Sequence, residues 1–551
     1  MKKIFFTLSI MGILVTSCSD EFLEKDPFGE ITDEQVLLPE NIEPLIISAY
    51  SILNGQGNEA SNAFNSPASN WSFGDVLSDD AYKGGGGTGD QNQIHRMEIY
   101  TTDSQIIDVE QKWSVLYEGI NRVNTVLKAL KNSTEFDEST KNQRVAEMRF
   151  LRGHFYFELK KIYNRISYID EEGNYFSNTM ITSDEVWTKI EDDFNAAFTV
   201  LPDTQDDPGR PTKWAAKAYL CKTYIFQQKW TEANSAADEV IVNGGYSLLP
   251  NFNEVFLPDN DNGPEVVFAI QYSINDGSPN NYNGSIGDRL MPPGGPRYNQ
   301  YGFLRPSQNL VNAFKTDVEG APQLDNVDVT ETDNVDPRLD VIVGRPGIPY
   351  KDLGINYEED WARDLATYGP YGPKKRVISA NDPNYLPSWP YVTAANYHII
   401  RYADVLLWKA EASIELDELE DGRTYINMVR NRAKTGTYIQ NLDGTADAAN
   451  YLIATYDTAF DTKEEAIVAL RTERRLEMAH EGHRFFDLVR WGIAAEVINT
   501  YLEKEKIQRG FLTGATFVEG KHEYMPIPQS QIDSGGTDDS GNSLTTQNPG
   551  Y

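Results

Sequence analysis

The stretch VAEMRFLRGHFYFELKKIY, residues 145–163, decides the fold class of this chain. Its apolar residues Met148, Leu151, Phe155, Leu159 and Ile162 recur at intervals of three and four. That spacing aligns them on one face of an α-helix. A helix with such a face needs an apolar partner in order to bury it, so the stretch predicts helix packed against helix.

Neighbouring segments show the same spacing. The segment WSVLYEGINRVNTVLKAL, residues 113–130, carries the apolar series Leu116, Ile120, Val123, Leu127 and Leu130. Further helical patterns cover residues 184–202, 209–226 and 229–246. The sequence therefore predicts a series of helices rather than a single pair.

The predicted ends of these helices are also visible. Asp184 is a candidate N-cap, and Pro202 is expected to stop that helix. Gly244 and Gly245 are expected to end the last helix of the series. Helices of this length joined by short turns are typical of stacked tetratricopeptide-like hairpins, so we expect a mainly α fold.

The pattern changes between residues 246 and 396, where Gly, Pro, Asn and Tyr accumulate and helical spacing is lost. Long ordered loops in a compact protein are usually functional, so this part is the expected ligand-binding region. Helix returns with RYADVLLWKAEASIEL, residues 401–416, which is apolar nearly all round and predicts a buried helix. We expect helical repeats over about 41–245 and 397–500, with an irregular loop-rich half packed on them.

The first residues read as an export signal. Lys2 and Lys3 precede the apolar run IFFTLSIMGILV, residues 4–15, which is too short to span a bilayer. VTSC then resembles a bacterial lipobox, which predicts a signal peptide over 1–17 and acylation of Cys18. Residues 18–40 would be a lipidated tether that holds the body, 41–551, at a membrane.

Composition excludes several functions. The formal net charge of −34 opposes binding to nucleic acid, whose phosphates are also negative. With Cys18 acylated, Cys221 is the remaining thiol, and its apolar surroundings favour a small buried side chain over a nucleophile. The usual motifs of hydrolases, nucleotide-binding and dinucleotide-binding proteins do not occur.

Several segments together resemble the SusD/RagB family of surface lipoproteins. They are WSVLYEGINRVN, AEMRFLRGHFYFELKKIY, GRPTKWAAKAYL, RYADVLLWKAEA, ERRLEMAHEGHRFFDLVRWG, YMPIPQSQI and QNPGY, and they occur in the family's order. The acidic SDEF after the lipobox fits the same pattern. Residues 275–395 contain no motif that aligns with the family.

The resemblance implies a function. Members of this family bind glycans, or in some cases peptides, at the outer cell surface of Gram-negative bacteria, as lids on SusC-like TonB-dependent transporters. It implies no enzymatic activity and no cofactor. We therefore expect an outer-membrane glycan-binding lipoprotein, with a peptide-binding member of the family and a surface glycoside hydrolase as the alternatives.

A glycan site needs flat rings for the apolar sugar faces and polar side chains for the hydroxyls. One candidate is residues 65–87, NSPASNWSFGDVLSDDAYKGGGG. The candidate ligand-binding residues there are Trp71, Asp75, Asp79, Asp80 and Lys83. Burial of Trp71 in a small satellite core is the alternative interpretation.

A second candidate is the loop-rich region, where exposed rings would indicate a binding surface. The candidate glycan-binding residues there are Tyr298, Tyr301, Trp361, Tyr371, Trp389 and Tyr391. Because the chain is strongly acidic, we expect a neutral polysaccharide or oligosaccharide as ligand. The cluster Lys374, Lys375 and Arg376 is the one basic group that argues for an anionic ligand.

The charged residues near the C-terminus alternate in sign. The arginines are Arg471, Arg474, Arg475, Arg484 and Arg490. An anion pocket is one interpretation, but helical spacing favours an ion-pair network that also includes Arg401 and Glu411. His480 and His483, and the acidic run 259–265, do not match complete zinc or calcium motifs, so we expect no metal.

Overall fold

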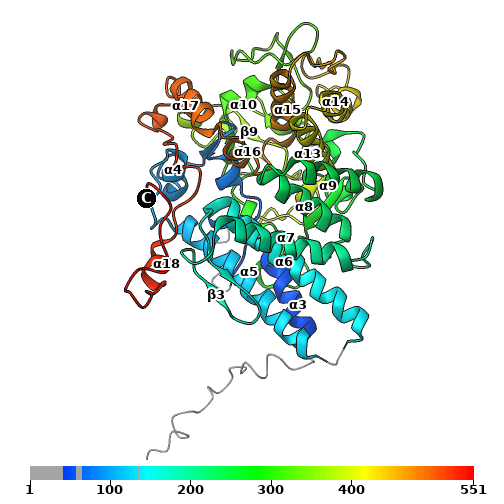
Figure 1. Cartoon of the computed structure of the whole chain (residues 1–551). Helices are drawn as coiled ribbons and strands as arrows, with labels where there is room; N and C mark the ends of the chain where they lie inside the picture. The colour runs from blue at the N-terminus through cyan, green and yellow to red at the C-terminus, as the bar shows by residue number, and fades with distance from the viewer. Residues whose placement is uncertain (1–40, 58–64, 134–135) are drawn as a thin grey trace, which may run out of the picture.

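The computed structural model describes residues 41–57, 65–133 and 136–551, and most of its regular structure is helical (Figure 1). The predicted signal peptide, Cys18 and the tether lie outside these residues. The longer helices are α3 (Ile42–Ser51), α5 (Ile107–Asn132), α6 (Glu138–Tyr163), α7 (Ser183–Val200), α8 (Lys213–Phe226), α9 (Trp230–Asn243), α13 (Tyr402–Glu415), α14 (Leu419–Thr435), α15 (Lys463–Met478) and α17 (Ala494–Glu505). The shorter helices that matter below are α4 (Asn92–Glu98), α10 (Gln308–Ala313), α16 (Arg484–Arg490) and α18 (Gln529–Ser534).

The helices stack in the order of the chain. From α5 to α9 each helix packs against the next, and α9 then packs against α13, which contacts α14 and α15. The apolar face of α5 is buried as predicted, including Leu116, Ile120 and Val123. This arrangement confirms the mainly α fold built on helical hairpins, since each hairpin buries its apolar faces on its neighbours.

Local signals fix the helix ends. Helix α7 starts with a capping box in which the Thr182 hydroxyl accepts from the N–H of Glu185 and the Glu185 carboxylate accepts from the N–H of Thr182. The predicted cap, Asp184, lies instead in the first turn, where an acidic side chain favours the helix dipole. The predicted ends are confirmed, because α7 ends at Val200 and α9 is capped by Gly244.

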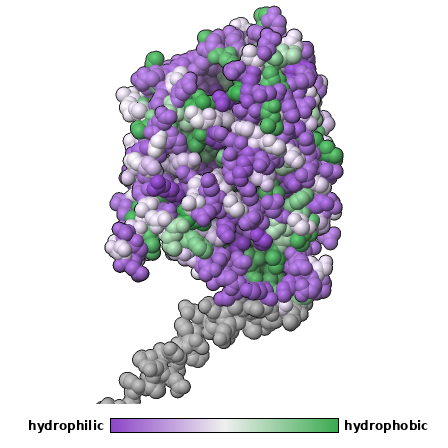
Figure 2. Space-filling model, in the orientation of Figure 1, coloured by the Kyte–Doolittle hydropathy of each residue, from purple (hydrophilic) through white to green (hydrophobic). Residues whose placement is uncertain are grey.

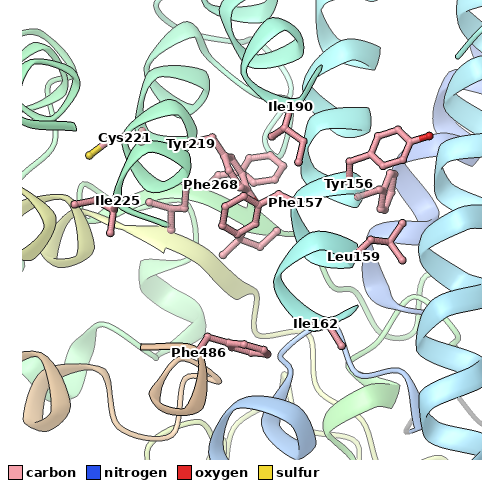
Figure 3. Packing of buried hydrophobic residues seen from close by; sticks show 14 of the residues in the cluster. Tyr156, Phe157, Leu159, Ile162, Ile190, Tyr219, Cys221, Ile225, Phe268 and Phe486 are labelled. Atoms are coloured by element: carbon pink, nitrogen blue, oxygen red, sulfur yellow. The ribbon is translucent and has the colours of Figure 1, made fainter. Parts of the chain in front are cut away.

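The core lies between the stacked helices. Helix α6 was expected to bury one face, but its residues from 146 to 163 are almost all buried, because α5 and α7 flank it. Figure 3 shows part of this core, with Phe157 and Tyr219 among its rings. Cys221 is fully buried there as a free thiol, which confirms its role as a small core residue.

Between Asn243 and Tyr402 the described helices are all short, and small antiparallel strand pairs tie this region together and to its neighbours, whereas β2 and β3 form a separate local hairpin. The pairs are β1 (Ala81–Gly84) with β5 (Phe303–Pro306), β2 (Tyr168–Ile169) with β3 (Tyr175–Phe176), β4 (Val266–Ile270) with β10 (Tyr397–Arg401), β6 (Lys315–Thr316) with β7 (Asn334–Val335), and β8 (Val343–Gly344) with β9 (Gly372–Pro373). The β1–β5 pair connects the loop-rich half to the N-terminal segment. The predicted domain division itself stays a prediction.

The surface is mainly hydrophilic on the face in Figure 2, and hydrophobic residues there form only small groups. In the described part of the chain, every helix is too short or too polar to cross a bilayer.

Candidate functional site

Three aromatic rings and one guanidinium group meet on the surface of the loop-rich half. The Tyr391 ring lies with its centroid 6.1 Å from that of Tyr301 and 6.4 Å from that of Trp389, with nearly perpendicular planes in both cases. The guanidinium carbon of Arg289 lies 4.7 Å from the centroid of the Trp389 ring. We call Arg289, Tyr301, Trp389 and Tyr391 the loop aromatic cluster.

Trp389 is the most exposed member, with 61% of its surface accessible, whereas the other three are partly exposed. A large ring at such exposure is costly without a partner that covers it. Burial lowers the pKa of Arg289, but a guanidinium starts so far above neutral pH that the group stays a cation. The cluster thus presents flat apolar faces beside charged and hydroxyl donors.

The loop that carries Trp389 and Tyr391 is held at both ends. The N–H of Leu386 donates to the carbonyl of Val392 at 2.9 Å, and Tyr385 forms an antiparallel bridge with Thr393. Val392 is fully buried, so this end of the loop is fixed to the core. Tyr391 has a positive φ of 61°, a strained conformation that often marks a ligand site.

A hollow of about 40 Å³ lies beside the cluster and is lined by Arg289, Tyr391, Asp288 and Glu481, among others. This volume has room for water molecules but is too small for a sugar ring. Asp288 forms an ion pair with Arg376. Burial raises the pKa of Glu481, but Arg401 and then Lys375 outweigh it and hold that pKa at about 2. Glu481 is therefore not available as a general acid at neutral pH.

The structure corrects the expectation that Trp71 lies on the surface. Its side chain is fully buried, and its indole N–H donates to the carbonyl of Gly287 at 3.0 Å. The ring also packs edge-on against Phe303 in a small satellite core. That satellite core is the alternative that the sequence left open, and it leaves the ring no free face for stacking.

Asp79 and Asp80 are likewise buried rather than exposed. Arg475 Nε lies 2.7 Å from an oxygen of Asp80, and Arg484 Nε lies 2.8 Å from one of Asp79. Burial raises the pKa of Asp79, but Arg475 and Arg484 outweigh it and hold that pKa at about 2. Both carboxylates therefore bind the C-terminal helices.

Asp75 and Lys83 also stabilise the fold through buried hydrogen bonds. Both oxygens of Asp75 accept from the N–H of Gly482, at 3.1 and 3.0 Å. The Lys83 ammonium donates to the carbonyls of Gly84, Gly87 and Asp90 at 2.9, 3.0 and 2.5 Å, and burial lowers its pKa to about 8. This lysine therefore organises the glycine-rich turn instead of facing solvent.

The loop-rich half has an aromatic core of its own, which contains two further predicted residues, and the third packs on a neighbouring apolar cluster. Tyr298 and Trp361 are 4% and 3% exposed, and Trp361 packs 5.0 Å from Tyr357 between ring centroids. Tyr371 is half-buried, with its hydroxyl 3.2 Å from the Gln308 amide oxygen. Of the six loop aromatics predicted from the sequence, the structure brings together Tyr301, Trp389 and Tyr391.

Arg289 was not predicted. It stands in GDRLMPPGG, residues 287–295, which the sequence marks only as a turn-rich segment. The position of Arg289 among Tyr-rich loops could have indicated it, because guanidinium groups stack on aromatic rings.

The basic cluster 374–376 is turned inward. Lys375 donates to Glu481 at 2.5 Å, Lys374 donates to the carbonyl of Pro349 at 2.7 Å, and Arg376 pairs with Asp288. Because these cations are already partnered, they do not form a basic surface for an anionic glycan.

The predicted C-terminal ion-pair network is confirmed for Arg474, Arg475, Arg484 and Arg490, whereas Arg471 lies over the Trp491 ring instead. Arg490 pairs with Glu411, and Arg474 pairs with Asp404 and Asp487. Arg401 is fully buried among Glu265, Glu477 and Glu481. Over the described residues, no group of three or more His, Cys, Asp and Glu side chains is arranged to hold a metal ion.

Known proteins resemble this chain along most of its length. The model of the SusD family matches residues 264–551, and a model described as starch-binding associating with outer membrane matches residues 21–225. SusD-like protein P25 of Formosa agariphila is 25% identical over 562 residues, which covers 94% of this chain and 95% of that protein.

Two solved structures show the same fold. A SusD superfamily protein from Bacteroides vulgatus superposes with a TM-score of 0.72 at 22% identity, covering 93% of this chain and 99% of the other. Surface glycan-binding protein A from Bacteroides thetaiotaomicron, solved in complex with laminarihexaose, superposes with a TM-score of 0.68 at 19% identity and the same coverage.

Proposed function

This chain belongs to the SusD family, and on that premise we propose that it is a glycan-binding protein of the outer membrane. The observation that carries the proposal is the loop aromatic cluster, where Trp389 is exposed beside Tyr391. Sugar rings stack their C–H faces on such rings. In this proposal the Arg289 guanidinium beside Trp389 and the hydroxyls of Tyr301 and Tyr391 bond the sugar hydroxyls.

The proposed ligand is a neutral polysaccharide or oligosaccharide. The chain carries a net charge of −34, which repels uronic and sulfated polymers. The one basic run in the loop-rich half, 374–376, is engaged by protein groups. The relatives support this class, since one family description names starch and one solved relative holds laminarihexaose.

The proposed role is capture without cleavage. A glycosidase needs a pair of carboxyl groups, one of them protonated at working pH. The two carboxylates beside the cluster, Asp288 and Glu481, are instead paired with cations. Captured glycan would pass to a SusC-like TonB-dependent transporter, for which this protein would act as the lid, tethered through acylated Cys18.

Affinity electrophoresis tests the proposal. The protein is run through native gels that contain starch, laminarin, a neutral mannan or polygalacturonate, beside serum albumin as a non-binding reference. We expect retardation in at least one neutral gel and none in polygalacturonate, and no release of reducing ends. Uniform migration in all gels, or competition by mixed oligopeptides instead of sugars, would reject a glycan-binding function.

A further inference from the structure

A second hollow is lined by residues that are distant in sequence from the loop aromatic cluster. Its volume is about 370 Å³, and it is enclosed by α5, the β2–β3 hairpin, and the C-terminal segment that includes α18. None of these elements contributes a residue to the loop aromatic cluster. The volume falls within the range of about 300–1,000 Å³ that is common for small-molecule sites.

Aromatic rings form one wall of this hollow. The rings of Trp113 and Tyr117 lie with centroids 4.8 Å apart and planes 39° apart. Tyr175, on the hairpin strand β3, also lines the hollow and has 44% of its surface accessible. The wall thus combines a buried indole with a tyrosine ring that is open to solvent.

The remaining lining is uncharged and mostly polar, with Ile169 as its apolar side chain. It includes Ser167, Gln531 and Thr545, and among the described residues that line the hollow none carries a charge. The Tyr117 hydroxyl donates to the carbonyl of Ser167 at 2.8 Å, and the Ser167 hydroxyl lies 3.1 Å from that of Tyr175. In a chain of net charge −34, an uncharged hollow with hydroxyl and amide groups suits a neutral polyhydroxylated ligand.

The walls are held in place by hydrogen bonds. The side chain of Asn178, just after β3, exchanges two bonds with the backbone of Thr546, both 2.9 Å long. The Thr179 hydroxyl donates to the carbonyl of Leu544 at 3.0 Å, and Ser104 donates to the Gln529 amide oxygen at 2.9 Å. These bonds fix the C-terminal segment against the hairpin and α5, so a ligand need not order the walls.

We propose that this hollow is a second saccharide subsite, separate from the loop aromatic cluster, that takes a neutral pyranose ring or a short neutral oligosaccharide. The sugar would stack on the exposed ring of Tyr175, with the largely buried Trp113 as the floor behind it, and Gln531 and Thr545 would bond its hydroxyls. The proposal rests on the glycan-binding function proposed above, to which it adds a second point of attachment.

Saturation-transfer NMR with the methyl glycosides of glucose, galactose, mannose and xylose tests the subsite. The Trp389→Ala variant removes the most exposed ring of the loop aromatic cluster, so that the hollow supplies a larger share of the remaining signal. Within that background, Tyr175→Ala removes the exposed ring, and Ser534→Trp fills the hollow from its rim. Phe176→Ala is the matched control, because Phe176 is the next residue on β3, is 37% exposed, and points to the opposite face of the hairpin.

We expect Trp389→Ala to keep a signal from at least one glycoside. Tyr175→Ala should then weaken that binding about tenfold, as loss of one stacking ring does, and Ser534→Trp should abolish it, whereas Phe176→Ala leaves it unchanged. Loss of all signal in Trp389→Ala alone, or a signal that neither Tyr175→Ala nor Ser534→Trp reduces, would overturn the second subsite while leaving the proposed function intact. If the unmodified protein gives no saturation-transfer signal with any glycoside and is not retarded in any gel, both the second subsite and the proposed function are rejected.

Discussion

Arg475 on α15 bonds Asp80 at the start of β1, with 2.7 Å between Nε and Oδ1, although 395 residues separate the two in sequence. The same arginine reaches Asp79, which also pairs with Arg484. This contact joins the N-terminal segment before β1 to the C-terminal helices, and β1 in turn pairs with β5 of the loop-rich half. It therefore fixes the support on which the binding loops rest.

Replacing Arg475 by Met should destabilise the protein by about 3 kcal/mol, because it leaves the buried Asp80 without its cation. The urea midpoint from circular dichroism measures the effect. The control is Lys131→Met, which removes an exposed ion pair with Glu172 and should leave the midpoint unchanged. Equal midpoints for Arg475→Met and the unmodified protein would show that this contact does not hold the two segments together.

Acid should weaken the fold through its buried carboxylates. The folded pKa of Glu481 is about 2, below the value of about 4.3 for a free Glu. A depressed folded pKa contributes stability that is complete above about pH 5 and is lost as pH falls toward 2. We therefore expect the urea midpoint to fall over this window.

The variant Glu481→Gln checks the assignment of that pH dependence. It should be less stable than the unmodified protein at pH 7, because Arg401 and Lys375 lose their carboxylate. The difference between the two midpoints should shrink as the pH approaches 2, where the native Glu481 is itself being protonated. A difference that stays constant from pH 7 to pH 2 would assign the acid sensitivity to other groups.

Trp389→Ala should weaken glycan binding about tenfold, since it removes the most exposed ring of the loop aromatic cluster. Titration calorimetry with the oligosaccharide of whichever polymer retards the protein measures the change. Stability should be unaffected because the ring is largely in solvent. Phe176→Ala, which removes another exposed ring away from the cluster, should bind as the unmodified protein does.

Cys221 should be unreactive in the folded protein. Its thiol is fully buried, and burial raises its pKa well above the usual range, so almost no thiolate forms at neutral pH. In a Cys18→Ser variant, a thiol reagent should label nothing in buffer and one group per chain in urea. Labelling of the native variant at the rate of a free thiol would mean that the α8 core opens readily.

Cys18→Ser should release the protein from membranes, because the predicted acyl chains would supply the anchor. Fractionation of cells into soluble and outer-membrane material measures the effect. Ser17→Ala, which leaves the cysteine in place, is the control. Retention of Cys18→Ser in the outer membrane would show that another contact holds the protein there.

The sequence could predict the helices and their ends because those depend on local chemistry. Apolar spacing in 113–130 and 145–163 places residues such as Leu116 and Phe155 on a helix face whatever the chain does elsewhere. The wrong prediction of the α7 N-cap was an error of only two residues, since the cap is Thr182 and not Asp184. The family motifs and the expected ion-pair network near the C-terminus were likewise visible in short stretches of sequence.

The candidate site was only partly predictable, because exposure is decided by distant contacts. Trp71 and Trp389 stand in similar turn-rich sequences, yet Trp71 is covered by Gly287 and Phe303, whereas Trp389 meets Arg289 at the surface. Loops have no periodicity that separates an inward from an outward side chain. The sequence by itself thus determined the helical scaffold, and the tertiary structure alone decided which rings face solvent, because burial there depends on segments hundreds of residues away.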